Sequence, residues 1–149
     1  MAEFSLQALH DEIESDPLEL GYKTGVVWKG DAEIADLINA LDGPGAAVIM
    51  RKLIEPSELW TSIPYAEYEL YGEAKREWLD TALELAGGTG IIDGNDEVVF
   101  ANLLAIFPGG SEARTNILAK IQRVGSRAEV LWGEGQVVTI SNVAYASNL

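Results

Sequence analysis

The feature that most constrains the fold is a series of short apolar stripes at helical spacing, each closed by a glycine or proline. The first stripe places Leu6, Leu9 and Ile13 at positions i, i+3 and i+7, directly after Ser5, a residue type that caps helix N-termini. The Asp16-Pro17 step ends it, because the residue before a proline is pushed out of the α region. A chain built from such pieces is predicted to be a set of short helices.

The same combination of cap, stripe and breaker recurs to the end of the chain, where Ser126 to Glu129 fits a capping box. Residues 46–54 are short, apolar and bounded by breakers, which favours a strand, and Val137-Val138 fits an extended pair. Further helices are predicted after Asp31, from Pro56, from Pro64, over 73–86, from Asp96 to Phe107, from Ser111 to Val124, over 126–133, and from Thr139 or Ser141 to Ser147. We predict a mainly α, compact multi-helix fold with at most one short strand pair.

Length and composition favour one domain. A chain of 149 residues with 48% hydrophobic residues can bury roughly 68–70% of its unfolded surface around one core. We therefore expect a single helical domain over residues 1–149. The start of the chain shows no secretory signal, and no apolar run approaches the roughly 18–20 residues that span a bilayer.

Charge and cysteine content exclude several functions. The net charge is −14, so the chain lacks the Lys/Arg surface that binds nucleic-acid phosphates or anionic membranes. There is no cysteine, which removes disulfides, thiolate metal sites and cysteine nucleophiles. We expect no direct nucleic-acid binding, no membrane association and no cofactor.

The negative charge is uneven along the chain. Residues 1–42 carry ten acids and two bases. Residues 43–98 carry eleven acids and four bases, whereas residues 99–149 carry three acids and four bases. Either the acids form a solvated face, or the near-neutral last third docks on a partner while the acidic part stays exposed.

No residue pattern indicates catalysis. His10 is the only imidazole and is predicted to be an ordinary surface residue. Residues 93–97 offer oxygen ligands without calcium-loop spacing, so a turn and an N-cap explain them as well. The glycine-rich residues 87–90 lack the lysine and hydroxyl of a phosphate loop. Gly109 to Ser111 would be a better anion seat at a helix start, but helix capping alone also explains this segment. We predict that the protein is not an enzyme and holds no metal.

Aromatic residues give the best candidate contact surface. Tyr65, Tyr68 and Tyr71 recur at i, i+3 and i+6, and Trp60 lies nearby. Such a stripe packs in the core or forms an interface, because aromatic residues are enriched at interface centres.

Three motifs resemble a known group of proteins. They are an opening Asp16-Pro17-Leu18 with Gly21-Tyr22, a central Phe107 with Gly109-Gly110-Ser111, and an ending Ser126-Arg127-Ala128-Glu129 with Leu131-Trp132-Gly133. Together they resemble a family of small, largely uncharacterised proteins of tailed bacteriophages and prophages.

The resemblance implies a structural component of the virion, made in the host cytoplasm and placed in the head–tail or tail region. Its implied partners are other virion proteins and further copies of itself; the alternative is a non-virion accessory or assembly-factor binding module. If residues 99–149 dock on neighbours, the predicted interface adds four residues to the aromatic stripe, namely Arg114, Arg123, Arg127 and Trp132.

Overall fold

The structure is a computed structural model that describes residues 2–77, 79–81 and 92–149. These residues are mainly helical, as the sequence predicted, and they divide into two compact units. Unit 1 comprises Met1–Ile49 and Val124–Leu149, and unit 2 comprises Met50–Arg123. Both ends of the chain therefore belong to unit 1.

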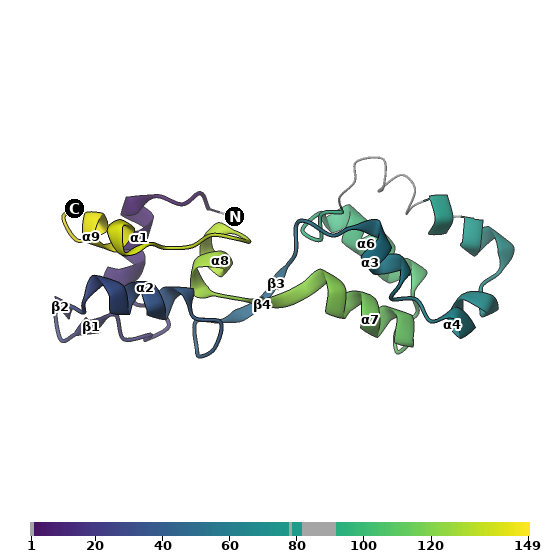
Figure 1. The fold of residues 1–149 in the computed structure, drawn as a ribbon, viewed down its shortest axis with the longest axis horizontal. Coiled ribbons are helices and arrows are strands. Elements are labelled where there is room, and N and C mark those ends of the chain that lie inside the picture. The colour runs from purple at the N-terminus through teal and green to yellow at the C-terminus, as the bar shows by residue number, and fades with distance from the viewer. Residues whose placement is uncertain (1, 78, 82–91) are drawn as a thin grey trace. The chain divides into compact units, whose positions relative to one another are not determined.

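Unit 1 contains four helices and a hairpin among its described residues. They are α1 (Leu6–Ser15), β1 (Lys23–Thr24), β2 (Val27–Trp28), α2 (Asp31–Asn39), α8 (Arg127–Trp132) and α9 (Ile140–Ala146). Helix α9 packs on α1 and α2, and α8 packs on α2 (Figure 1). Their apolar faces meet in one core, whose largest fully buried side chains are Leu9, Ile13, Tyr22, Ile34, Ile38 and Val138.

The helices of unit 1 begin at the caps that local sequence indicates. Ser5 Oγ accepts a hydrogen bond from the Ala8 amide, 3.1 Å away, and Thr139 caps α9 in the same way. Ser126 and Glu129 form the predicted capping box. Helix α2 differs by one residue: Gly30 is the N-cap, and Asp31 lies in the first turn, where its charge complements the helix dipole.

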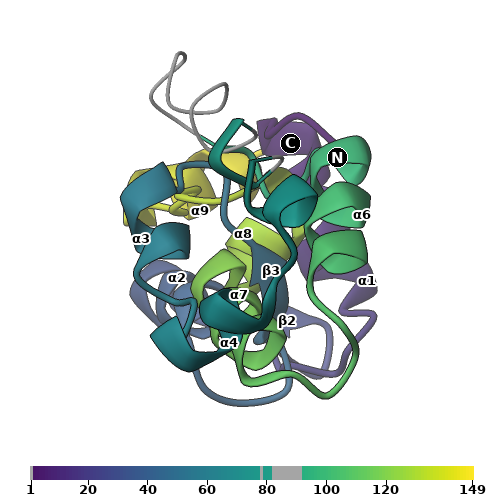
Figure 2. The same cartoon turned by 90° about the vertical axis from the view of Figure 1, so that its right-hand side faces the viewer.

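Unit 2 packs helices from residues 50–123 around a second core (Figure 2). It contains α3 (Pro56–Trp60), α4 (Tyr65–Leu70), α6 (Glu97–Ile106) and α7 (Glu112–Ile121), and residues 73–77 and 79–81 are also helical. Helix α3 packs on α7, and an isolated bridge joins Ile54 to Ile92. The largest fully buried side chains here are Ile54, Leu59, Leu79, Phe107, Ile117 and Ile121.

Among the described residues, the buried apolar side chains divide between two clusters instead of forming the one core that length and composition favoured, and the single domain over residues 1–149 stays a prediction. Residues 50–123 form their own cluster, and the two flanking segments of the chain form the other. Periodicity shows which residues face inward but not which stripes meet.

The expectation of at most one strand pair is wrong. Strands β1 and β2 form an antiparallel hairpin, and β3 (Ala47–Met50) pairs with β4 (Gln122–Gly125) in a second two-stranded sheet. The unit boundary falls inside both β3 and β4.

Strand β4 occupies residues that the sequence assigned to the end of a helix. Helix α7 ends at Ile121, and Val124, predicted to face inward, is 51% exposed. Gly125 lies so close to Ile49 that a Cβ there would be 2.6 Å from Ile49 Cδ1. This close approach, which the helical pattern does not reveal, accompanies the extended conformation.

Two sequence predictions fall partly or wholly outside the described residues. The helix over 73–86, with Trp78, Ala82 and Leu85 on one side, is described only at 73–77 and 79–81, and the glycine-rich turn at 87–90 is not described. Within the described part, no helix combines the length and apolar character needed to cross a bilayer.

Candidate functional site

Unit 2 carries a groove at its surface, lined by Trp60, Ile63, Tyr65 and Tyr68, which we call the aromatic groove. Trp60 ends α3, Ile63 lies in the turn that follows, and both tyrosines belong to α4. The groove has a volume of about 190 Å³. Tyr65 is 73% exposed and Trp60 is 42% exposed, so large aromatic surfaces face solvent.

A chain of ring contacts connects the groove to the core of unit 2. The Trp60 and Tyr68 rings meet edge to face at 5.4 Å, and Tyr68 meets Tyr71 at 6.1 Å. Tyr71 in turn lies 6.4 Å from Phe107, which is fully buried. These contacts fix the Tyr68 ring, and with it one side of the groove.

The predicted tyrosine stripe is divided between surface and core. Helix α4 ends at Leu70, and Tyr71 takes an extended conformation with φ −72° and ψ 137°. Its ring therefore leaves the helical spacing and packs against the core, while Tyr65 points outward. Three residues of the predicted contact surface line the groove, namely Trp60, Tyr65 and Tyr68, whereas Ile63 also lines it and carried no distinguishing signal in the sequence.

Two basic side chains lie on the tyrosine rings. The Arg76 guanidinium is 5.2 Å from the Tyr68 ring centre, and the Lys75 ammonium is 4.1 Å from that of Tyr71. Arg76 Nε also donates to the Tyr68 carbonyl at 3.2 Å. Burial raises the pKa of the Tyr71 phenol, and the negative charge of Glu67 raises it further.

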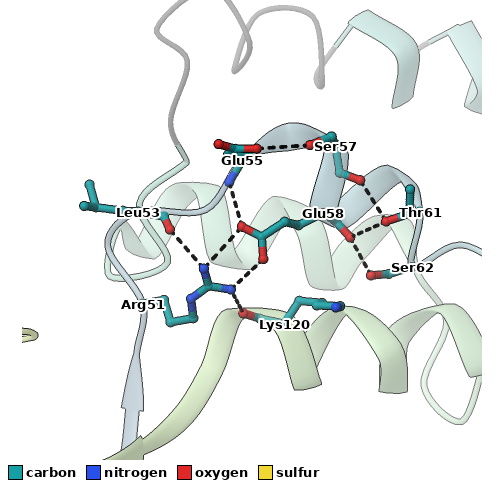
Figure 3. A network of polar contacts seen from close by, with 8 residues as sticks. All are labelled: Arg51, Leu53, Glu55, Ser57, Glu58, Thr61, Ser62 and Lys120. Atoms are coloured by element: carbon teal, nitrogen blue, oxygen red, sulfur yellow. Dashed lines mark hydrogen bonds and ion pairs between the residues drawn. The ribbon is translucent and has the colours of Figure 1, made fainter.

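A polar network holds α3, and so Trp60, in place (Figure 3). Arg51 forms a two-pronged ion pair with Glu58, with its Nη1 2.8 Å from Oε2 and its Nη2 3.2 Å from Oε1. The same guanidinium donates to the carbonyl of Lys120, at the end of α7, at 2.8 Å. The hydrogen bond from Arg51 holds the pKa of Glu58 below its ordinary value of 4.5.

The predicted anion seat at Gly109 to Ser111 is filled by the protein itself. Ser111 Oγ accepts from the Arg114 amide, and Glu67 Oε1 of α4 accepts from the Ala113 amide at 3.1 Å. A carboxylate at a helix N-terminus interacts favourably with the free amides and the dipole. Glu67 therefore ties the groove helix α4 to α7 instead of leaving a ligand site there.

The four interface residues predicted outside the aromatic stripe lie in two different units. Arg114 donates to the Phe107 carbonyl at 3.3 Å in unit 2, and Arg123 is half-buried in β4. Arg127 is largely buried in an ion pair with Glu12, and the Trp132 ring packs edge-on against Phe4 at 5.1 Å in unit 1. Two of these residues therefore belong to each unit, and their common role in an interface stays a prediction.

The remaining candidates for chemistry have internal partners. His10 is half-buried at the surface, with Nδ1 2.9 Å from the Ala146 carbonyl oxygen. Asp93 accepts from the Asn95 amide within a turn, and Asp96 caps α6. Among the described residues there is no group of three or more side chains that could hold a metal ion.

No protein-family model, curated protein or solved structure matches the chain. Its function is therefore inferred from its own residues and their geometry.

Proposed function

We propose that this chain is a structural component of a tailed-bacteriophage virion, in the head–tail or tail region, and that it acts by protein–protein assembly. The aromatic groove is the observation that carries the assembly part, because exposed aromatic side chains characterise the centres of protein interfaces. The three motifs that resemble the phage family support the virion part.

The contacts that the motif residues make within unit 1 also support a structural role. The Asp16 carboxylate accepts hydrogen bonds from the amides of Leu20 and Gly21 and shapes the loop after α1. Arg127, from the closing motif, pairs with Glu12 in the helix before the opening motif, with Nε 2.7 Å from Oε1. Opening and closing motifs thus specify the packing of unit 1, which is what an assembly subunit requires of its framework.

Other exposed apolar side chains add to this support. Val26 is 91% exposed at the tip of the β1–β2 hairpin, and Leu70 is 85% exposed at the end of α4. Single exposed apolar residues are ordinary, but a subunit that assembles covers such side chains with neighbours.

Quantitative mass spectrometry of purified particles of the encoding phage tests the proposal. We expect the chain at a fixed copy number relative to the major capsid protein, retained after washing in high salt. Presence in infected cells together with absence from purified particles would refute the virion role and favour the accessory or assembly-factor alternative.

A further inference from the structure

We infer that the aromatic groove binds a basic segment of a partner protein. A lysine or arginine of that segment lies on the open faces of Trp60 and Tyr65, beside Glu69, and an adjacent apolar side chain of the segment fills the groove. The inference rests on the proposed function only in taking the occupant to be a protein. Three independent observations lead to it: the size of the groove, the absence of a cation of the described chain on two of its rings, and the charge around it.

The size of the groove favours side chains over a small-molecule ligand. Its volume of about 190 Å³ is below the roughly 300–1,000 Å³ of typical cofactor and ligand pockets. A groove of this size accommodates one or two side chains of a docked segment.

The ring faces show which side chains the site accepts. Arg76 already lies on Tyr68, and Lys75 lies on Tyr71. No lysine or arginine of the described chain lies on Trp60 or Tyr65, whose rings are exposed. Cations are attracted to the faces of tryptophan and tyrosine rings, so the two exposed rings can accept a cation from outside.

The charge around the groove selects a basic occupant. Residues 55–81 contain seven acids and two bases, and both bases lie on tyrosine rings. Glu69 follows Tyr65 by four residues in α4, which places the two side chains on the same helix face. Five acids of this segment are exposed and form no ion pair with any described residue: Glu55, Glu69, Glu73, Glu77 and Asp80.

The same charge disfavours a second copy of the chain as the occupant. Each copy carries a net charge of −14, and acids outnumber bases in both units. Two such negative surfaces repel each other when they meet. A basic segment is attracted to the groove within the Debye length, which is about 8 Å at physiological salt.

Selection of short random displayed peptides on the full chain tests the inference without presupposing a partner. We expect the enriched peptides to carry lysine or arginine next to an apolar residue. Their synthetic versions should bind Tyr65→Ala and Glu69→Lys about tenfold more weakly than the unmodified chain. Affinity should also fall as salt increases.

Two matched variants serve as controls. Tyr145→Ala removes a tyrosine of similar exposure, 65% against 73%, from α9 in unit 1, and Glu3→Lys makes the same charge change at the N-terminus. Both should bind the peptides like the unmodified chain. Circular dichroism spectra matching those of the unmodified chain would show that Tyr65→Ala and Glu69→Lys fold.

The inference is overturned if no peptide is enriched, if the enriched peptides are acidic or uncharged, or if Tyr65→Ala and Tyr145→Ala bind them equally well. Concentration-dependent self-association that Tyr65→Ala abolishes would overturn it as well, by identifying a second copy as the occupant. The copy number in purified particles is independent of these results, so the proposed function can fail or stand separately.

Discussion

At the scale of single residues, the ion pair between Glu12 and Arg127 is the strongest candidate for a fold-determining contact. The two side chains are 8% and 12% exposed and meet through two hydrogen bonds, at 2.7 and 3.0 Å. The hydrogen bonding of the Arg127 guanidinium to the Glu12 carboxylate raises the pKa of Arg127. Gly45 allows this packing, because a Cβ there would lie 3.2 Å from Arg127 Cβ.

We predict that Arg127→Met lowers the free energy of unfolding by about 3 kcal/mol, because it leaves the Glu12 carboxylate buried without its partner. The double variant Glu12→Leu with Arg127→Met should recover much of that loss, since it removes both charges. Urea unfolding followed by circular dichroism measures both effects. A single variant as stable as the unmodified chain would contradict the assigned role of the pair.

The pair between Arg51 and Glu58 predicts a pH dependence. Because the pKa of Glu58 is lowered in the folded state, its contribution to stability is present above the ordinary value of 4.5 and is lost as the pH falls through the lower folded pKa. Glu58→Gln should lower stability at neutral pH by about 1 kcal/mol, because both side chains are partly exposed.

Thermal unfolding of both proteins between neutral and acidic pH measures this effect. The difference in melting temperature between Glu58→Gln and the unmodified chain should shrink below pH 4.5. A difference that stays constant across this range would show that the charge of Glu58 does not act on stability.

Sequence predicted the contacts that are local and missed those that join distant residues. The caps at Ser5, Asp96 and Ser111 follow from residues two or three positions apart, which a linear pattern contains. Glu67 capping α7 at Ala113 joins residues 46 positions apart. Such partners depend on how the helices pack, which periodicity leaves open.

At the scale of elements, helix ends decide where the candidate site lies. The prolines at their starts predicted α3 and α4. The tyrosine spacing suggested that the helix continues beyond Leu70, but α4 ends there. Because α4 ends there, Tyr71 packs against Phe107 in the core, which is one of the two positions that the sequence left open for the stripe. The sequence thus indicated the aromatic residues of the groove. It did not show that Ile63 lines the groove or that Tyr71 does not.

Strand β4 provides a prediction at the same scale. Gly125→Ala should destabilise the protein by about 1–3 kcal/mol, because its Cβ would lie within 3.1 Å of three carbons of Ile49. Adding Ile49→Ala should restore part of the loss by removing those carbons. Gly72→Ala, whose Cβ meets nothing within 4 Å, is the control and should leave stability nearly unchanged, as measured by urea unfolding.

At the scale of the whole molecule, charged and buried residues are grouped by the two units and not by thirds of the sequence. Unit 1 carries twelve acids and three bases, and unit 2 carries twelve acids and seven bases. The near-neutral last third contributes most of α6 and all of α7 to unit 2, and α8 and α9 to unit 1. Its buried residues, such as Ile117 and Val143, pack within the protein and are not available for docking.

Separate cores predict separable responses to core mutations. Ile38→Ala should cost about 2–5 kcal/mol and raise amide hydrogen exchange in unit 1, while unit 2 keeps its protection. Ile117→Ala should do the reverse. Equal loss of protection in both units from either variant would instead indicate one cooperative domain over residues 1–149.

The central claim is that the chain assembles into a virion through the aromatic groove. Incorporation of variants into particles of a phage that lacks the native gene tests this claim most directly. We predict that Tyr145→Ala is incorporated at the copy number of the unmodified chain, whereas the double variant Trp60→Ala with Tyr65→Ala is made, folded and excluded from purified particles. Equal incorporation of both variants, or absence of even the unmodified chain from the particles, would contradict the claim.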